Sequence, residues 1–128
     1  MPQPPADSAV PPDAARDRAL AALTALANGT RLDLIRSLVA AGDEGLPAGV
    51  LARRHGLAGS RLSFHLAALE QAGLVTARRV SRNIFYAADT ARLGQTIGFL
   101  LNDCCAAHPQ VSACCGAAGP GAVIRPER

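Results

Sequence analysis

The sequence contains no lysine, so arginine supplies all 13 basic side chains among its 128 residues. It has no apolar run of the roughly 18 residues that a membrane-spanning helix requires. The N-terminal stretch MPQPPADSAVPPDAARD lacks the basic start and the apolar centre of a secretory signal peptide. These absences predict a cytoplasmic protein with no membrane partner.

Cysteine is scarce and confined to one place. All 4 cysteines lie within NDCCAAHPQVSACC, residues 102–115. In the reducing cytoplasm, clustered thiols more often bind soft metals or sense redox state than form structural disulfides. A disulfide between neighbouring cysteines is strained, because adjacent Cα atoms are only about 3.8 Å apart. The cluster is therefore a candidate metal or redox site.

Charge is unevenly distributed along the chain, whose formal net charge is +3 and whose pI is near 9.0. In the segment 53–82, Glu70 is the only acidic residue and the basic residues are Arg53, Arg54, Arg61, Arg78, Arg79 and Arg82. A basic centre of this kind predicts a polyanionic partner, most simply nucleic acid. The alternative is an arginine-rich surface that is merely solvated.

The length suits one small domain, with oligomerisation as a further source of stability. Residues 1–13 are rich in proline and small side chains, which predicts a disordered arm. Residues 14–107 carry the periodic apolar pattern of a folded domain. Residues 108–128 are expected to form a flexible tail that holds the second cysteine pair.

Apolar residues recur at helical spacing before and after the basic segment. The first two helices are expected to bury Leu20, Leu23, Ala27, Leu32, Ile35 and Val39. A third, short helix fits residues 46–55, with Gly56 as its left-handed cap. The last helix begins near Asp89 as N-cap, and its apolar stripe is Leu93, Ile97, Leu100 and Cys104. The same helix of a second subunit would cover that stripe, or the first helix of the same chain would.

The segment LAGSRLSFHLAALEQAGL predicts a helix with two different faces. Its core face consists of Leu62, Leu66 and Leu69, whereas its outward side consists of Ser60, Arg61 and Phe64, flanked by Ser63 and His65. In a DNA major groove, arginine bonds guanine and an apolar ring meets a thymine methyl group. We therefore expect a recognition helix here; the alternative is that Phe64 packs on a neighbouring element.

The runs LVTARRV and IFYAAD, separated by SRN, predict a β-hairpin with a three-residue turn. Arg78 and Arg79 are adjacent in a strand and point to opposite faces, so only one of them is expected to reach DNA. Arg82 and Asn83 lie at the turn, where a side chain is free to contact phosphate. The expected fold is mainly α with a β-hairpin wing, a winged helix-turn-helix.

The runs ALANGTRLDLIRSL and LARRHGLAGSRLSFHLAALEQAGLVTARRVSRNIFYAA resemble the ArsR/SmtB family of metal-sensing bacterial repressors over residues 18–105. The resemblance implies a homodimer that binds operator double-stranded DNA and releases it when an inducer binds. It places the recognition positions on Ser60, Arg61, Ser63 and His65, and the wing on residues 78–83. Ala58 replaces the usual capping serine, so Ser60 is a candidate cap.

The resemblance also bears on the inducer. The C-V-C motif of many arsenite sensors is absent from residues 46–55, and the last helix lacks the histidines of the family's zinc sites. Some arsenite sensors instead carry a cysteine pair after the last helix. The resemblance thus implies As(III) as inducer, with Sb(III) also possible, and the metal ligands Cys104, Cys105, Cys114 and Cys115. A trivalent ion takes three thiolates, so one cysteine of the second pair would complete the first pair.

Other chemistries stay open for these thiols. Four thiolates also suit Cd, Zn or Pb, and oxidation could join the two pairs. Thiols at a helix C-terminus meet its negative dipole, which raises their pKa and slows oxidation. A thiol enzyme would need a cysteine at a helix N-terminus or in an anion-binding loop, and neither is present, so no enzyme is predicted. A structural DNA-binding protein with a metal-buffering tail is the third possibility.

Overall fold

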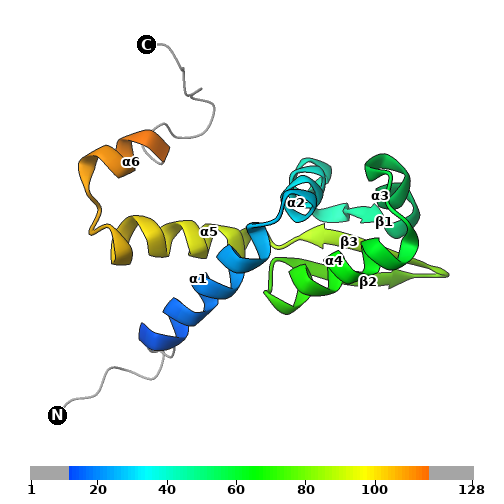
Figure 1. Cartoon of the computed structure of the whole chain (residues 1–128), viewed down its shortest axis with the longest axis horizontal. Helices are drawn as coiled ribbons and strands as arrows, with labels where there is room; N and C mark the ends of the chain where they lie inside the picture. The colour runs from blue at the N-terminus through cyan, green and yellow to red at the C-terminus, as the bar shows by residue number, and fades with distance from the viewer. Residues whose placement is uncertain (1–11, 116–128) are drawn as a thin grey trace.

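The computed structural model describes residues 12–115, which form a helical body with a small sheet at one end (Figure 1). The helices of the body are α1 (Pro12–Leu26), α2 (Gly29–Ala41), the 3₁₀ turn η1 (Gly42–Glu44), α3 (Ala48–His55), α4 (Gly59–Gln71) and α5 (Thr90–Gly98). The strands are β1 (Leu46–Pro47), β2 (Val75–Val80) and β3 (Asn83–Ala88). The predicted mainly α fold with a β-hairpin wing is confirmed. Within residues 12–115, no helix has both the length and the apolar character needed to cross a membrane.

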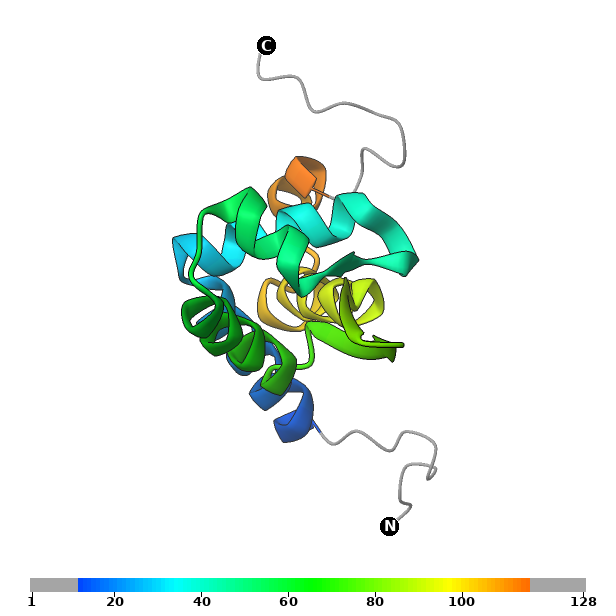
Figure 2. The same ribbon diagram turned by 90° about the vertical axis from the view of Figure 1, so that its right-hand side faces the viewer.

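One hydrophobic core joins the helices to the sheet. Its fully buried side chains come from α2, α3, α4 and the start of β2, and they are Leu34, Leu38, Leu51, Leu66, Leu69, Leu74 and Val75. Burying a leucine or valine side chain contributes about 1.5–3 kcal/mol each. Figure 2 looks at the end of the molecule that carries α2, α3, α4 and the wing, the four elements that this core holds in place.

Of the residues predicted to be buried in the first two helices, Ile35 is buried, but most of the others are not. In α1 the buried side chains are Ala19, Ala22 and Ala25, while Leu20 and Leu23 are exposed. In α2 the core side chains are Leu34, Ile35 and Leu38, while Leu32 and Val39 are exposed. Each helix carries two adjacent apolar stripes, and small alanines let α1 approach its neighbours closely. The predicted stripes were therefore wrong by about one position around the helix.

Helix ends agree better with the sequence. Asp89 caps α5 as predicted, because its carboxylate accepts a hydrogen bond from the Arg92 N–H at 3.1 Å. Gly56 ends α3 in the left-handed conformation, with φ 62° and ψ 38°, also as predicted. Asn28 caps α2 through a 3.0 Å bond from the Arg31 N–H.

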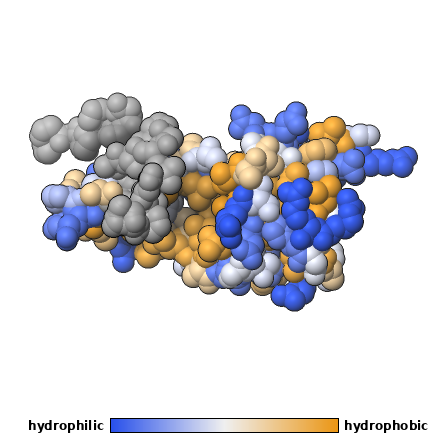
Figure 3. Space-filling view, turned by 90° about the horizontal axis from the view of Figure 1, so that it is seen from above, coloured by the Kyte–Doolittle hydropathy of each residue, from blue (hydrophilic) through white to orange (hydrophobic). Residues whose placement is uncertain are grey.

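The wing is a regular antiparallel hairpin to which β1 adds a third strand, in the order β1-β3-β2. Arg78 pairs with Phe85 and Val80 with Asn83, so the turn has two residues rather than the three predicted. Ser81 begins the turn with φ 60°, the positive φ that tight hairpin turns require. In Figure 3 the far end of the wing is hydrophilic.

The chain beyond α5 is more ordered than predicted. A wider π-type turn, η2 (Phe99–Cys104), continues α5, and the Cys105 N–H bonds the Leu100 carbonyl five residues earlier at 3.0 Å. The chain then reverses direction, and α6 (Pro109–Cys115) follows (Figure 1). Pro109 predicts a helix end just after the first cysteine pair, and η2 ends at Cys104 with Cys105 as its C-cap; the predicted tail of 108–128, however, begins with a helix. Its remaining residues, 116–128, lie outside the described part, as do residues 1–11 of the predicted arm.

Helix α6 has a clear local cause. Pro109 occupies the first helical position, where its fixed φ suits a helix and its missing N–H is not needed. The Nδ1 atom of His108 accepts a hydrogen bond from the Gln110 N–H at 3.1 Å, as a capping side chain does. Pro109 therefore acts as a helix start.

Alanine substitutions should distinguish the buried apolar stripe of α2 from its exposed one. Replacing Leu38, which is fully buried, with alanine is expected to lower the free energy of unfolding by about 2–5 kcal/mol because it leaves a cavity. Val39→Ala, one residue along and 45% exposed, is the matched control and should change it by less than about 0.5 kcal/mol. Urea unfolding measures both, and equal losses would contradict this core.

Candidate nucleic-acid interface

The exposed face of α4 carries most of the residues predicted to read DNA. Ser60, Arg61, Ser63 and Phe64 are all exposed, and Phe64 is 64% accessible although its side chain is apolar. The opposite face is anchored in the core by Leu62, Leu66 and Leu69. Phe64 is therefore not buried by a neighbouring element, and the face exposes a guanidinium, hydroxyls and an aromatic ring.

The start of α4 differs from the prediction in one respect. Ala58 occupies the N-cap position, and no side chain caps the helix there. Ser60 lies inside the first turn and does not replace the missing cap. Its exposed hydroxyl is left for a ligand.

His65 does not belong to this face. Its side chain is only 6% exposed, and its Nδ1 atom accepts a hydrogen bond from the Nε–H of Arg31 at 3.2 Å. Its ring meets that of Phe64 edge to face, with centroids 5.3 Å apart. A buried imidazole cannot reach a base edge, so the prediction that His65 reads DNA was wrong. A side chain at the boundary between the two faces of a helix can point to the core or to the solvent, and that of His65 points to the core.

The protonation state of His65 follows from these contacts. Burial first, then the positive charges of Arg31 and Arg61, lower the pKa of His65 below its ordinary value of 6.5. Because the arginine Nε can only donate, the neutral ring accepts at Nδ1 and carries its proton on Nε2.

The wing separates its two adjacent arginines as predicted. Arg78 lies over the Phe85 ring, 5.4 Å from its centroid, and donates a hydrogen bond to the Glu44 carbonyl at 3.4 Å. Arg79 is on the opposite face of the strand. Within the described residues, the ion pairs involve neither Arg79 nor Arg82, and both side chains are exposed. Asn83 is exposed beside the turn.

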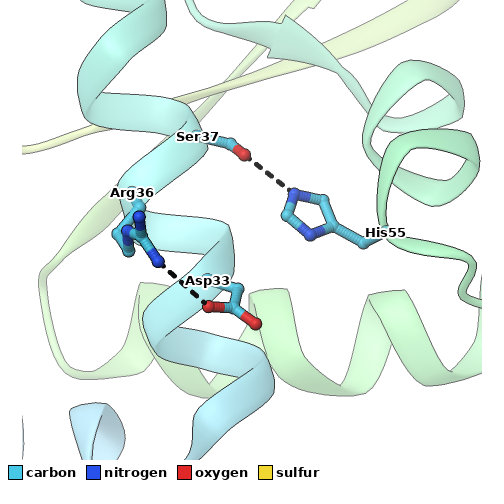
Figure 4. Close-up of polar contacts among 4 residues, drawn as sticks. All are labelled: Asp33, Arg36, Ser37 and His55. Carbon is cyan, nitrogen blue, oxygen red and sulfur yellow. Dashed lines mark hydrogen bonds and ion pairs between the residues drawn. The ribbon is translucent and has the colours of Figure 1, made fainter.

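A polar contact sets the position of α3 relative to α2 (Figure 4). The Ser37 hydroxyl and the His55 Nε2 atom are 2.9 Å apart, and one turn earlier Arg36 and Asp33 form an ion pair at 3.7 Å. His55 therefore has a packing role beyond ending its helix. Since α3 leads directly into α4, this contact also helps to position the exposed face of α4.

Comparison with known proteins identifies the family. Residues 26–78 match the family model of a helix-turn-helix domain. The nodulation protein NolR of Rhizobium meliloti is 37% identical over 93 residues, covering 71% of this chain and 74% of that protein. An ArsR-like transcriptional regulator from Rhodococcus has a solved structure with TM-score 0.64 and 28% identity, covering 77% of this chain and 90% of that one. The chain belongs to the ArsR family of transcriptional regulators.

A further solved structure is similar to this ArsR-family chain. It is the homodimeric winged helix-turn-helix DNA-binding domain of a possible ArsR-family regulator from Mycobacterium bovis, with TM-score 0.55 and 25% identity. The match covers 80% of this chain and 89% of that domain. The two solved neighbours are described as a transcriptional regulator and a possible one, which agrees with the predicted DNA-binding regulator.

The first cysteine pair of this ArsR-family chain is available for chemistry. Cys104 is exposed, Cys105 is partly buried, and both are free thiols at the end of η2. Hydrogen bonding with Cys104, then burial and the charge of Cys104, raise the pKa of Cys105 above its ordinary value. The predicted direction is confirmed, but the leading cause is the neighbouring thiol.

The second pair is described less fully. The backbones of Cys114 and Cys115 end α6, and their side chains lie outside the described residues. Among the side chains that the structure does describe, no three from His, Cys, Asp and Glu are placed together to hold a metal. The four-cysteine ligand set thus remains a prediction.

The His65 contact predicts a pH dependence of stability. The pKa of His65 in the folded chain lies below its unfolded value, so the unfolded state binds more protons as the pH falls below about 6.5. Its contribution is fully present above that pH and is lost below it. Urea unfolding at a series of pH values should show this loss in the wild type and a smaller loss in His65→Gln. Identical pH profiles for the two chains would refute the assignment.

Proposed function

We propose that this chain is a homodimeric, cytoplasmic repressor that binds operator double-stranded DNA and releases it when As(III) or Sb(III) binds the C-terminal thiolates. The observation that carries the DNA-binding part is the exposed face of α4, where Phe64 is 64% accessible beside Arg61. An aromatic ring with this much of its surface in water suits contact with a thymine methyl group.

The interface assigns separate roles to helix and wing. Arg61 is the candidate for a bidentate bond to guanine, and Ser60 and Ser63 supply adaptable hydroxyls. Arg79 and Arg82 extend from the wing with no ion-pair partner among the described residues, so they are the candidates for phosphate contact. Arg78 is held by Glu44 and Phe85, which makes it the less available arginine of the adjacent pair.

Exposed apolar surface supports a dimer. Helices α1 and α5 pack on each other within one chain, and both leave large apolar side chains in solvent: Leu20 at 47%, Leu23 at 38% and Ile97 at 51% exposed. A second copy that covers these side chains would bring two α4 helices into one dimer, and the solved neighbour from Mycobacterium bovis is homodimeric. Recognition helices of such dimers meet DNA about 34–36 Å apart, one helical turn.

The thiol site lies where the dimer helix ends. Cys104 and Cys105 are adjacent and free, and the chain reverses between them and α6, which ends in Cys114 and Cys115. As(III) takes three thiolates and tolerates adjacent sulfurs that would strain a disulfide. Binding of one cysteine from the second pair would tie α6 to the end of η2 and shift α5, and with it the spacing of the two α4 helices.

Footprinting on the DNA upstream of the chain's own gene tests this function. The dimer should protect a site in the absence of arsenite, and saturating arsenite should weaken binding by about 5–150-fold, the size of ordinary allosteric coupling. Cadmium, zinc, lead and a thiol oxidant form parallel arms. An effect of one of these agents alone would assign a different inducer, whereas no protection at all would refute DNA binding.

Cysteine variants locate the site. Cys104→Ser is expected to bind the same DNA as tightly as the wild type but to lose the response to arsenite, since two thiolates hold As(III) more weakly than three. Cys114→Ser and Cys115→Ser, compared side by side, should differ, and the variant that loses the response identifies the third ligand. Loss of DNA binding in Cys104→Ser would mean that this cysteine is structural.

A further inference from the structure

We propose that Arg31 is a further DNA-contacting residue, which binds a backbone phosphate beside α4 and is positioned for this by His65 and Phe64. This inference rests on the DNA-binding part of the proposed function. The sequence gives no signal of this role, because Arg31 lies outside the basic segment and 34 positions away from His65.

Two contacts position the Arg31 guanidinium, and a third holds its backbone. Its Nε–H donates to the buried Nδ1 of His65 at 3.2 Å, and its central carbon lies 5.7 Å from the centroid of the Phe64 ring. Its backbone N–H is held by the Asn28 cap at the start of α2. A long side chain that is already ordered loses less entropy when it binds a ligand.

The contacts leave the binding end of Arg31 free. Within residues 12–115, one of the five guanidinium N–H groups makes a hydrogen bond, and the two terminal nitrogens carry the other four. Among the described residues, the ion pairs do not include Arg31. A half-buried guanidinium with a free planar fork is the donor arrangement that matches a phosphate group.

The location of Arg31 complements that of the wing. Arg31 lines a groove of about 400 Å³ between α1 and α4, with Ala68 and Gln71 on the α4 side. Arg78 of the wing instead bonds Glu44, beyond the opposite end of α2. The part of α2 between residues 31 and 41 is about 15 Å long at 1.5 Å per residue. A major groove is about 12 Å wide and has a sugar-phosphate backbone on each side. The wing would therefore contact the backbone of one DNA strand, and Arg31 would contact that of the other.

Salt dependence distinguishes a phosphate contact from a structural role. Each phosphate contact adds about 0.9 to the slope of log affinity against log salt concentration on duplex DNA. Arg31→Gln should therefore reduce that slope by about 0.9 for each bound protomer, and Arg31→Lys should restore most of it because the charge is retained. Arg36→Gln, on the same helix and paired with Asp33, is the matched control and should leave the slope unchanged.

The measurement uses the full-length chain with two probes, a mixed-sequence 30-base-pair duplex and the upstream duplex, titrated from 50 to 200 mM salt. Urea unfolding of each variant checks that it is folded under these conditions. A wild-type slope in Arg31→Gln, with wild-type binding intact, would overturn the Arg31 assignment alone. A slope that falls equally in the Gln and Lys variants would show a structural role. Salt-independent or absent binding by the wild type would overturn the DNA-binding proposal itself.

Discussion

Burial of one face of α4 is the constraint on which the rest of the structure depends. Leu62, Leu66 and Leu69 lie in the core, and because each residue of a helix turns by about 100°, their burial fixes the direction of every other side chain on α4. Arg61 and Phe64 are exposed as a consequence, whatever their own preference for water. The same core holds Leu74 and Val75, so the wing begins at a fixed position relative to α4.

The elements around α4 are held to it by polar contacts at the edges of that core. His55 bonds Ser37 between α3 and α2, and His65 accepts from Arg31 between α4 and α2. Each pair joins residues far apart in the sequence, 18 positions for the first and 34 for the second. A net hydrogen bond contributes only about 0.5–1.5 kcal/mol, so these contacts orient the helices, while apolar burial supplies most of the stability.

Features set by local chemistry could be predicted from the sequence. The Asp89 cap, the left-handed Gly56, the strands of the wing and the buried stripe of α4 all depend on residues within a few positions of one another. Features that depend on tertiary contacts could not. The sequence of α1 does not indicate that Ala22 is buried and Leu23 exposed, because the helix has two adjacent stripes and both consist of apolar residues. Arg31 and His65 likewise acquire their roles only when α2 and α4 pack together.

The chain reversal between η2 and α6 has a strained backbone, and it lies next to the cysteines of the proposed inducer site. Ala106 and Ala107 both have left-handed backbones, with φ 53° and 55°, a conformation that costs about 1–2 kcal/mol for each non-glycine residue. Coupling free energies between two binding sites are typically about 1–3 kcal/mol, the same size. In the proposed mechanism, an ion that bridges Cys104 or Cys105 to α6 acts across this turn. The bound ion needs to change only the backbone conformation of these two alanines and does not have to rearrange the core. A shift of α5 would then transmit this change to the dimer interface.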